Sequence, residues 1–477
     1  MRVPGFVGGS YQSVSQIAAG EECINFLLER MPVGGKSSSM LISGPGVTTR
    51  GASTEGPCRG LFHEDGRAFG VYGATLYEID SAYAFTSRGT ITNDGNPVTM
   101  DTNGDAGGEL FIVGGDTGYI LTLATNVLAS VVTDVTFGGQ IDGFFLALDH
   151  ESSTLKISES LDGSTWDGTQ IAQRTAGSDP WHAMTVIRRE AVLVGEYTGE
   201  VWYNSGASPF PFALRPGSFF EVGIKAHWSL ARFGTTCVWL GQTRRGGTAV
   251  YWLNGYIPEP ISTPGIEWLI QSYEETGDIG NAIGWSYDRE GHSFYVLEFP
   301  TQGKTLIYDA STTNWHRQGL WSSDENDYLA WRPRWHCKAF DQNLVGDGTN
   351  AGLYSLSSTV YTDVDGEPLR WLRRTPHLSD ENVRLFFQYA ELECDRGVGT
   401  TSGQGVNPLI SLRYSDDGGK TWSDARTRTL GALGEYDTRV RWDMCGSGRD
   451  RVWELSGSDP VAIRLIDFFV GVEKGIH

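Results

Sequence analysis

The feature that most constrains the fold is a strand pattern that repeats from about residue 55 to residue 360. In each repeat a short apolar strand is followed by a turn of Gly, Asp or Asn residues and by a second strand that ends in a polar turn. Roughly seven repeats follow one another at a spacing of about 40 to 50 residues, which is the period of propeller blades. They lie at Leu61–Asp80, Gly108–Leu123, Gly143–Trp166, Ala183–Tyr203, Thr236–Asn254, Trp285–Trp315 and His336–Leu356.

Hairpins of this kind alternate apolar and polar positions, and one hairpin cannot bury both faces of its sheet alone. Radial stacking of the sheets buries the second face. We therefore predict an all-β protein built on a β-propeller of about six or seven blades. A tandem of β-sandwiches is the alternative architecture. The abundance of glycine (62 residues), with 16 Trp, 19 Tyr and 21 Phe, agrees with many tight turns between aromatic-rich strands.

The C-terminal part of the chain has a different pattern. Its strands, such as Phe386–Cys394, Leu409–Tyr414 and Ala462–Val470, are longer and alternate more evenly. They predict an additional antiparallel β domain. We expect three parts: an N-terminal extended segment (1–54), a β-propeller (55–360) and a C-terminal β region with an Asp-box hairpin (361–477).

Helix signals are scarce. The best candidate is Glu21–Glu29, which is short and equally compatible with an extended segment. The second is Gly265–Tyr273, where Ile266, Leu269 and Ile270 share one helical face.

The net charge of −21 argues against tight binding of nucleic acid, because a protein neutralises phosphates with Lys and Arg. The same charge suits a wall along which DNA slides, and it equally suits simple solubility. No run approaches the roughly 20 apolar residues of a membrane span, and Met1–Tyr11 lacks the apolar core of a signal peptide. Six scattered cysteines lack zinc or disulfide spacing. We expect them to be reduced and mostly buried, and we expect no metal ion and no cofactor.

The sharpest local motif is an Asp box, S-x-D-x-G-x-T-W, formed by Ser415, Asp417, Gly419, Thr421 and Trp422. In a hairpin turn the aspartate can accept hydrogen bonds from backbone N–H groups, and the glycine allows a permissive φ. We expect the tryptophan to anchor the turn in the sheet core. A shortened version occupies residues 160–166. Asp boxes occur in sialidases, where they are structural and lie away from the active site. We therefore assign these residues a structural role and expect no catalytic residue.

Glycan hydrolysis is the enzymatic alternative. A sialidase needs an arginine cluster that holds the substrate carboxylate, together with a Tyr nucleophile and a carboxylate partner. Arginines are available, but nothing in the sequence marks three of them as convergent: Arg232, Arg332, Arg334, Arg373 and Arg374.

Two further patterns for ligand binding are incomplete. The run GGKS at residues 34–37 resembles a P-loop, but the required glycine at position 30 is Arg30. The acidic loops Asp101–Asp105 and Asp324–Asp327 offer oxygen ligands for calcium without a full ligand loop, and solvated turns explain them better.

An ordered series of segments between Phe219 and Leu320 resembles the packaged-DNA stabilisation proteins, or tail accessory hubs, of short-tailed phages. The segments that carry the resemblance are GSFFEVGIKAHWSLARFGTTCVWLG, GTAVYWLNGYIPEPISTPGIEWLIQSY and SFYVLEFPTQGKTLIYDASTTNWHRQGL. The N-terminal stretch Tyr11–Gly46 also resembles the opening of that family. The C-terminal Asp-box region departs most from the family pattern.

The resemblance implies a structural virion protein and not an enzyme. It implies a hexameric hub, or nozzle, around the tail axis, assembled in the host cytoplasm between an adaptor (head-to-tail) protein and the distal tail needle or fibres. Double-stranded DNA would be retained by this channel after packaging and would pass through it at ejection without specific binding. The alternatives are a carbohydrate-active, sialidase-like tail protein and a monomeric propeller that acts as a binding module.

Overall fold

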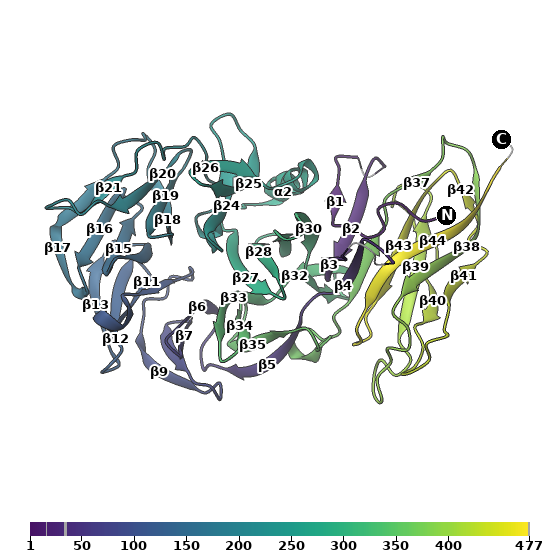
Figure 1. The fold of residues 1–477 in the computed structure, drawn as a ribbon, viewed down its shortest axis with the longest axis horizontal. Helices are drawn as coiled ribbons and strands as arrows, with labels where there is room; N and C mark the ends of the chain where they lie inside the picture. The colour runs from purple at the N-terminus through teal and green to yellow at the C-terminus, as the bar shows by residue number, and fades with distance from the viewer. Residues whose placement is uncertain (16, 33–35, 476–477) are drawn as a thin grey trace.

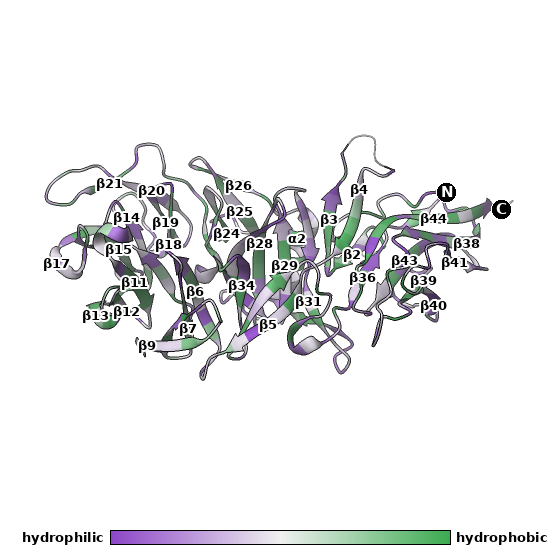
Figure 2. Cartoon of the chain, turned by 60° about the horizontal axis from the view of Figure 1, so that its bottom comes forward, coloured by the Kyte–Doolittle hydropathy of each residue, from purple (hydrophilic) through white to green (hydrophobic). Residues whose placement is uncertain are grey.

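The protein is elongated, with a β-propeller at one end and a β-sandwich at the other (Figure 1). The computed structural model describes residues 1–15, 17–32 and 36–475. Strands of both parts carry hydrophobic stretches between more hydrophilic loops (Figure 2).

Seven sheets make up the propeller in the described part of the chain. Blade 1 contains β6 (Cys58–Glu64), β7 (Arg67–Tyr72), β8 (Thr75–Ile79) and β9 (Phe85–Thr90); blade 2 contains β10 (Thr99–Thr102), β11 (Glu109–Gly114), β12 (Thr117–Thr122) and β13 (Val127–Thr133); blade 3 contains β14 (Phe137–Ile141), β15 (Phe144–Asp149), β16 (Thr154–Glu159) and β17 (Asp162–Gln173). Blade 4 contains β18 (Trp181–Ile187), β19 (Glu190–Gly195), β20 (Gly199–Asn204) and β21 (Phe212–Leu214); blade 5 contains β22 (Gly223–Ile224), β23 (Ala231–Phe233), β24 (Thr236–Gln242), β25 (Thr248–Asn254) and β26 (Ile257–Pro260). Blade 6 contains β27 (Ile283–Arg289), β28 (His292–Phe299), β29 (Lys304–Asp309) and β30 (Asn314–Arg317); blade 7 contains β33 (Pro333–Ala339), β34 (Gln342–Asp347), β35 (Gly352–Ser357) and β5 (Gly46–Ala52).

The propeller prediction is confirmed, and each of the seven sequence repeats falls within one blade. The innermost strands contact one another around a closed ring, from β6 through β10, β14, β18, β23, β27 and β33 back to β6. The second strand of each blade, counted from the axis, packs against the neighbouring blades on both faces. Because both faces are buried, such strands are nearly continuous apolar runs, as in Glu109–Gly114. Outer strands such as β13 are largely exposed.

The last blade is closed by the N-terminal part of the chain. Strand β5 pairs antiparallel with β35, with Val47 opposite Leu356. This pairing joins residues about 300 positions apart in the sequence. The closing strand belongs to residues 1–54, so this N-terminal segment supplies part of the propeller.

The remaining N-terminal strands enter the sandwich. They are β1 (Tyr11–Gln12), β2 (Gly20–Ile24), β3 (Phe26–Arg30) and β4 (Ser39–Ser43). The helix considered for Glu21–Glu29 is wrong, and the extended alternative is right. Asn25 has φ +60° between β2 and β3, and its amide hydrogen-bonds to the backbone of Gly319 and Arg370, so the two strands diverge into different sheets.

Two sheets form the sandwich. Its other strands are β36 (Trp371–Arg374), β37 (Leu378–Ser379), β38 (Leu385–Cys394), β39 (Leu409–Ser415), β40 (Arg426–Thr429), β41 (Val440–Asp443), β42 (Ser447–Gly448), β43 (Asp450–Gly457) and β44 (Arg464–Lys474). One sheet has the order β2-β36-β43-β39-β40, and the other has the order β3-β4-β44-β38-β41. The first sheet is continuous with blade 6, because β2 also pairs in parallel with β30.

Aromatic side chains fill the sandwich core. Trp453 is fully buried, and its ring lies 5.5 Å from that of Phe387 and 5.7 Å from that of Phe468. All six cysteines are buried and free, as expected.

Helices are few and short. The helix at Gly265–Tyr273 is confirmed as part of α2 (Pro264–Thr276), where the Thr263 side chain caps the first turn by accepting a hydrogen bond from the N–H of Ile266. The other elements are α1 (Gly104–Gly107), the 3-10 turns η1 (His227–Ser229) and η2 (Val364–Gly366), and the hairpin β31 (Gly319–Ser322) with β32 (Asp327–Ala330). Among the described residues, no helix has the length and apolar character that crossing a membrane requires.

Candidate functional site

The Asp box forms the turn between β39 and β40. The Asp417 carboxylate accepts hydrogen bonds from the N–H groups of Lys420 (3.0 Å) and Thr421 (2.9 Å), and from the hydroxyls of Thr421 and Ser415. These donors, led by Thr421, lower the pKa of Asp417. Gly419 has φ +91°, which a side chain would disfavour. The box is a self-contained turn whose polar groups are used by the turn itself.

Trp422 lies at a different place from the one expected. Its indole is half-buried outside the sandwich core, and its N–H donates to the carbonyl of Gly419 at 3.1 Å. The ring lies against two guanidinium groups, with Arg413 at 4.7 Å and Arg374 at 5.0 Å from its centroid. The expected anchor in the core is therefore wrong, because the turn places the indole over charged side chains of the sheet.

Five side chains of alternating charge lie on the sheet that joins the propeller to the sandwich. We call them the charge ladder: Arg317 on β30, Glu22 on β2, Arg374 on β36, Glu454 on β43 and Arg413 on β39. Successive members are separated by 3.0, 3.2, 2.8 and 2.5 Å between nitrogen and oxygen atoms. The central carboxylate, Glu454, has a side chain that is only 1% exposed.

Strand register explains the ladder. Glu22 is directly opposite Arg374, which is opposite Glu454, which is opposite Arg413. Directly opposed residues share a face and interact. Buried ion pairs stabilise little on balance, but leaving one member without its partner is costly. The ladder therefore fixes the register of strands from the N-terminus, the propeller and the sandwich.

The shortened Asp box also forms a structural turn, and this turn lies between two blades of the propeller. Asp162 accepts from the N–H of Ser164 at 3.0 Å, and Trp166 donates to the carbonyl of Gly163 at 2.7 Å. The Trp166 ring lies 5.5 Å from that of Phe111 on β11, so this turn packs blade 3 against blade 2.

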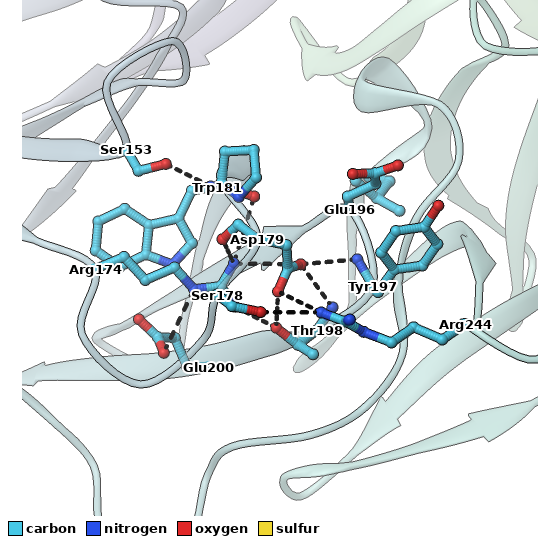
Figure 3. A network of polar contacts seen from close by, with 12 residues as sticks. Ser153, Arg174, Ser178, Asp179, Trp181, Glu196, Tyr197, Thr198, Glu200 and Arg244 are labelled. Atoms are coloured by element: carbon cyan, nitrogen blue, oxygen red, sulfur yellow. Dashed lines mark hydrogen bonds and ion pairs between the residues drawn. The ribbon is translucent and has the colours of Figure 1, made fainter.

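A second polar network lies between blades 3 and 4 (Figure 3). Asp179, just before β18, accepts from the N–H groups of Tyr197 (2.8 Å) and Thr198 (3.0 Å). Arg174, just after β17, lies 3.4 Å from the Asp179 carboxylate and 3.9 Å from that of Glu200. Burial alone would raise the pKa of Asp179, but these hydrogen bonds and the Arg174 charge together lower it. Burial raises the pKa of Glu200.

Three histidines gather near one mouth of the propeller channel. The rings of His182 and His227 are stacked at 4.5 Å, and His150 lies 6.1 Å from His227. His150 and His227 line a depression of about 690 Å³. Burial, reinforced by the other two histidines, lowers the pKa of His227 to about 4, and burial also lowers the pKa of His182. Both are therefore neutral at pH 7.

The propeller axis itself is narrow and mostly apolar. A cavity of about 300 Å³ is lined by residues of all seven blades, with Asp101 and Arg232 as its charged groups. Desolvation raises the pKa of Asp101 to about 6. Gly284 allows β27 to approach η1, since a Cβ there would lie 2.2 Å from the carbonyl oxygen of Ser229. The axis is far too small for a DNA duplex.

The arginines considered for a sialidase site are dispersed. Arg232 lines the axial cavity, Arg332 pairs with Asp347 and Asp365, Arg334 pairs with Glu298, Arg373 donates to backbone carbonyls of the N-terminal segment, and Arg374 belongs to the charge ladder. The geometry gives no support to a shared carboxylate site for these residues.

The structure gives no support to the calcium-binding interpretation of the acidic loops. Asp101 accepts hydrogen bonds from the N–H groups of Thr102 and Gln140. Within the described ranges, no group of three or more His, Cys, Asp or Glu side chains is placed to hold a metal ion. Gly34 and Gly35 of the P-loop-like run lie outside the described residues.

Comparison with known families decides between these interpretations. The model of the bacteriophage P22 Gp10 β-propeller matches residues 8–361, and that of the P22 Gp10 β-sandwich matches residues 370–473. The chain belongs to the bacteriophage P22 Gp10 family. It is a phage structural protein, and the family is that of the podovirus tail hubs, as the sequence segments indicated. A search of curated proteins gave no match.

Similar solved structures are remote. YCF48 from Cyanidioschyzon merolae has a TM-score of 0.37 and 11% identity, covering 65% of this chain and 98% of that one. PorZ of Porphyromonas gingivalis has a TM-score of 0.34 and 10% identity over 73% of this chain, which spans 45% of PorZ. An exo-β-1,3-galactanase from Phanerochaete chrysosporium has a TM-score of 0.31 and 7% identity, covering 89% of this chain and 99% of that one. We draw no argument about function from these three.

Sequence reasoning missed the charge ladder and the histidine group. Glu22 lies hundreds of positions before Arg374, and Arg374 lies tens of positions before Glu454. Only strand pairing brings these residues together. His182 and His227 likewise meet through the packing of neighbouring blades. In the sequence each of these two histidines is adjacent to a tryptophan, Trp181 or Trp228, a pattern that indicates packing.

Proposed function

We propose that this protein is a tail hub of a short-tailed phage, located in the virion, that forms part of the head-to-tail channel. It retains packaged DNA and conducts it at ejection. The observation that carries the proposal is the match of both domains to the P22 Gp10 family. The continuous sheet and charge ladder between the domains support a mechanical role, because they join propeller and sandwich into one load-carrying unit.

The DNA path in this proposal lies between copies of the chain. The axial cavity of about 300 Å³ excludes a duplex, so the channel wall is formed by a ring of copies, which we propose to be a hexamer. With a net charge of −21, such a wall repels phosphates and allows DNA to slide without specific binding. Its neighbours are an adaptor protein toward the head and needle or fibre proteins distally, and assembly takes place in the host cytoplasm.

A phage that lacks this gene tests the proposal. We expect particles that package DNA and then lose it, so that the genome becomes sensitive to nuclease, with restoration when the protein is supplied in trans. Particles that keep a protected genome and a complete tail without the protein would contradict the role.

We also propose that the protein performs no catalysis. Dispersal of the five candidate arginines supports this, and incubation with host surface glycans is expected to release no sugar. If the protein were instead a monomeric binding module, it would remain a monomer when mixed with its adaptor. Mass measurement of the mixture distinguishes this alternative from the ring.

A further inference from the structure

A pocket of about 220 Å³ lies beside the charge ladder, where propeller and sandwich meet. Ile24 and Leu372, which are buried, form its apolar part. The β31–β32 hairpin covers one side and contributes Trp321 and Tyr328. The pocket therefore combines an apolar base with the charged face of the joining sheet.

The pocket is positively charged within a strongly acidic protein. Four arginines and two carboxylates line it, which leaves an excess of two positive charges: Arg317, Arg370, Arg374 and Arg413 against Glu22 and Asp327. Glu454 and Lys304, which pair with lining residues from outside, cancel each other. A cationic pocket in a chain of net charge −21 favours an anionic ligand.

Arg370 supplies one of the two excess positive charges. Its guanidinium lies 3.7 Å from the centroid of the Trp321 ring, and it forms no ion pair with any residue that the structure describes. A guanidinium stacked by its face on an aromatic ring keeps its N–H edges available for two parallel hydrogen bonds.

Tyr328 supplies an unused donor. The residue is 3% exposed, and its hydroxyl has no hydrogen-bond partner among the described residues. Its ring lies 5.1 Å from that of Trp321, so Tyr328 and Arg370 contact the same indole. Buried hydroxyl groups in native proteins are almost always hydrogen-bonded, so this one lacks an acceptor.

We propose that this junction pocket binds a carboxylate group, with Arg370 and the Tyr328 hydroxyl as its donors. The volume suits a small acid or one acidic side chain. The same sheet face already holds two carboxylates, Glu22 and Glu454, against the side chain of Arg374, so carboxylates are anions that this face accommodates.

Titration calorimetry with succinate, in a buffer free of phosphate and other carboxylates, tests the proposal. We expect saturable binding by the intact chain. Arg370→Gln and Tyr328→Phe should each weaken it about tenfold, the usual loss for one hydrogen bond to a charged ligand. Tyr328→Phe removes no hydrogen bond present in the free protein, so its fold should be preserved.

Two variants serve as matched controls. Tyr287→Phe removes another buried hydroxyl without a partner among the described residues, outside the pocket, and Arg245→Gln removes an exposed positive charge. Both should bind succinate like the parent. Absence of succinate binding, equal losses in the controls, or binding of inorganic phosphate in place of succinate would overturn the proposal.

Sedimentation of the same variants identifies the source of the carboxylate. If it is an acidic side chain of a second copy, Arg370→Gln raises the concentration needed for assembly and succinate competes with assembly. If it is a free acid, assembly is unchanged while succinate binding is weakened. The calorimetry does not depend on the virion role, so the two proposals can fail separately.

Discussion

Single carboxylates hold together strands that are far apart in the sequence, and Glu454 is the central example. Replacing it by Gln leaves Arg374 and Arg413 without a shared anion in a buried position. We expect Glu454→Gln to lower the free energy of unfolding by about 3 kcal/mol, the cost of breaking a buried ion pair. Urea unfolding measures this. Glu151→Gln, at an exposed loop, should change little, and equal effects would contradict the importance of the ladder.

The Asp box makes a local prediction at the same scale. Asp417→Ala removes the acceptor of the Lys420 and Thr421 amides, so these two N–H groups should exchange with solvent faster. Because the pKa of Asp417 is lowered, its contribution is present at neutral pH and is lost on acidification below the ordinary range of aspartate. Hydrogen exchange detects the change. Asp424→Ala in the same loop is the control, and slow exchange that persists in Asp417→Ala would refute the assignment.

Histidine burial predicts a pH dependence. The pKa of His227 is about 4 in the folded protein, below its ordinary value of 6.5. Between pH 4 and pH 6.5 the unfolded chain therefore binds more protons than the folded protein. Stability is therefore complete above about pH 6.5 and falls as the pH drops toward 4, by up to about 3 kcal/mol from this residue. Thermal unfolding at pH 7 and pH 4.5 should show a smaller difference for His227→Gln than for the parent. An unchanged difference would show that His227 does not contribute.

At the scale of elements, the closing strand β5 controls the integrity of the propeller. Val47 is 4% exposed and packs in the core that β5 shares with blades 6 and 7. Val47→Asp buries an unpaired charge and should lower stability by at least about 2 kcal/mol, with early proteolysis of blade 7. Thr49→Asp, exposed on the same strand, should be tolerated. If both variants resist protease equally, β5 is not needed for closure.

The sequence revealed the blades because each is a local unit: at least three strands of every blade are consecutive, and the period of the pattern is visible in the residues. It also revealed the Asp box, whose contacts span five residues or fewer. It could not reveal that β2 and β5 pair with strands from residues 352–374, because short strands whose partners are distant carry no periodicity of their own. The position of Trp422 could not be predicted either, because its ring lies against Arg374, which belongs to a strand that is distant in the sequence.

At the scale of the whole molecule, the chain is an elongated pair of β domains joined by a continuous sheet (Figure 1). A joint of this kind resists bending better than a flexible linker, which suits the head-to-tail channel role that we propose. The net charge of −21 and the narrow propeller axis support our proposal that the DNA path lies between copies of the chain.

Electron cryo-microscopy of intact virions would locate the chain in the tail. We expect six copies of the propeller and sandwich arranged as a ring around the tail axis, between the adaptor and the distal tail proteins, with DNA passing between the copies. Density for the chain away from the tail axis, or as isolated single copies, would contradict it.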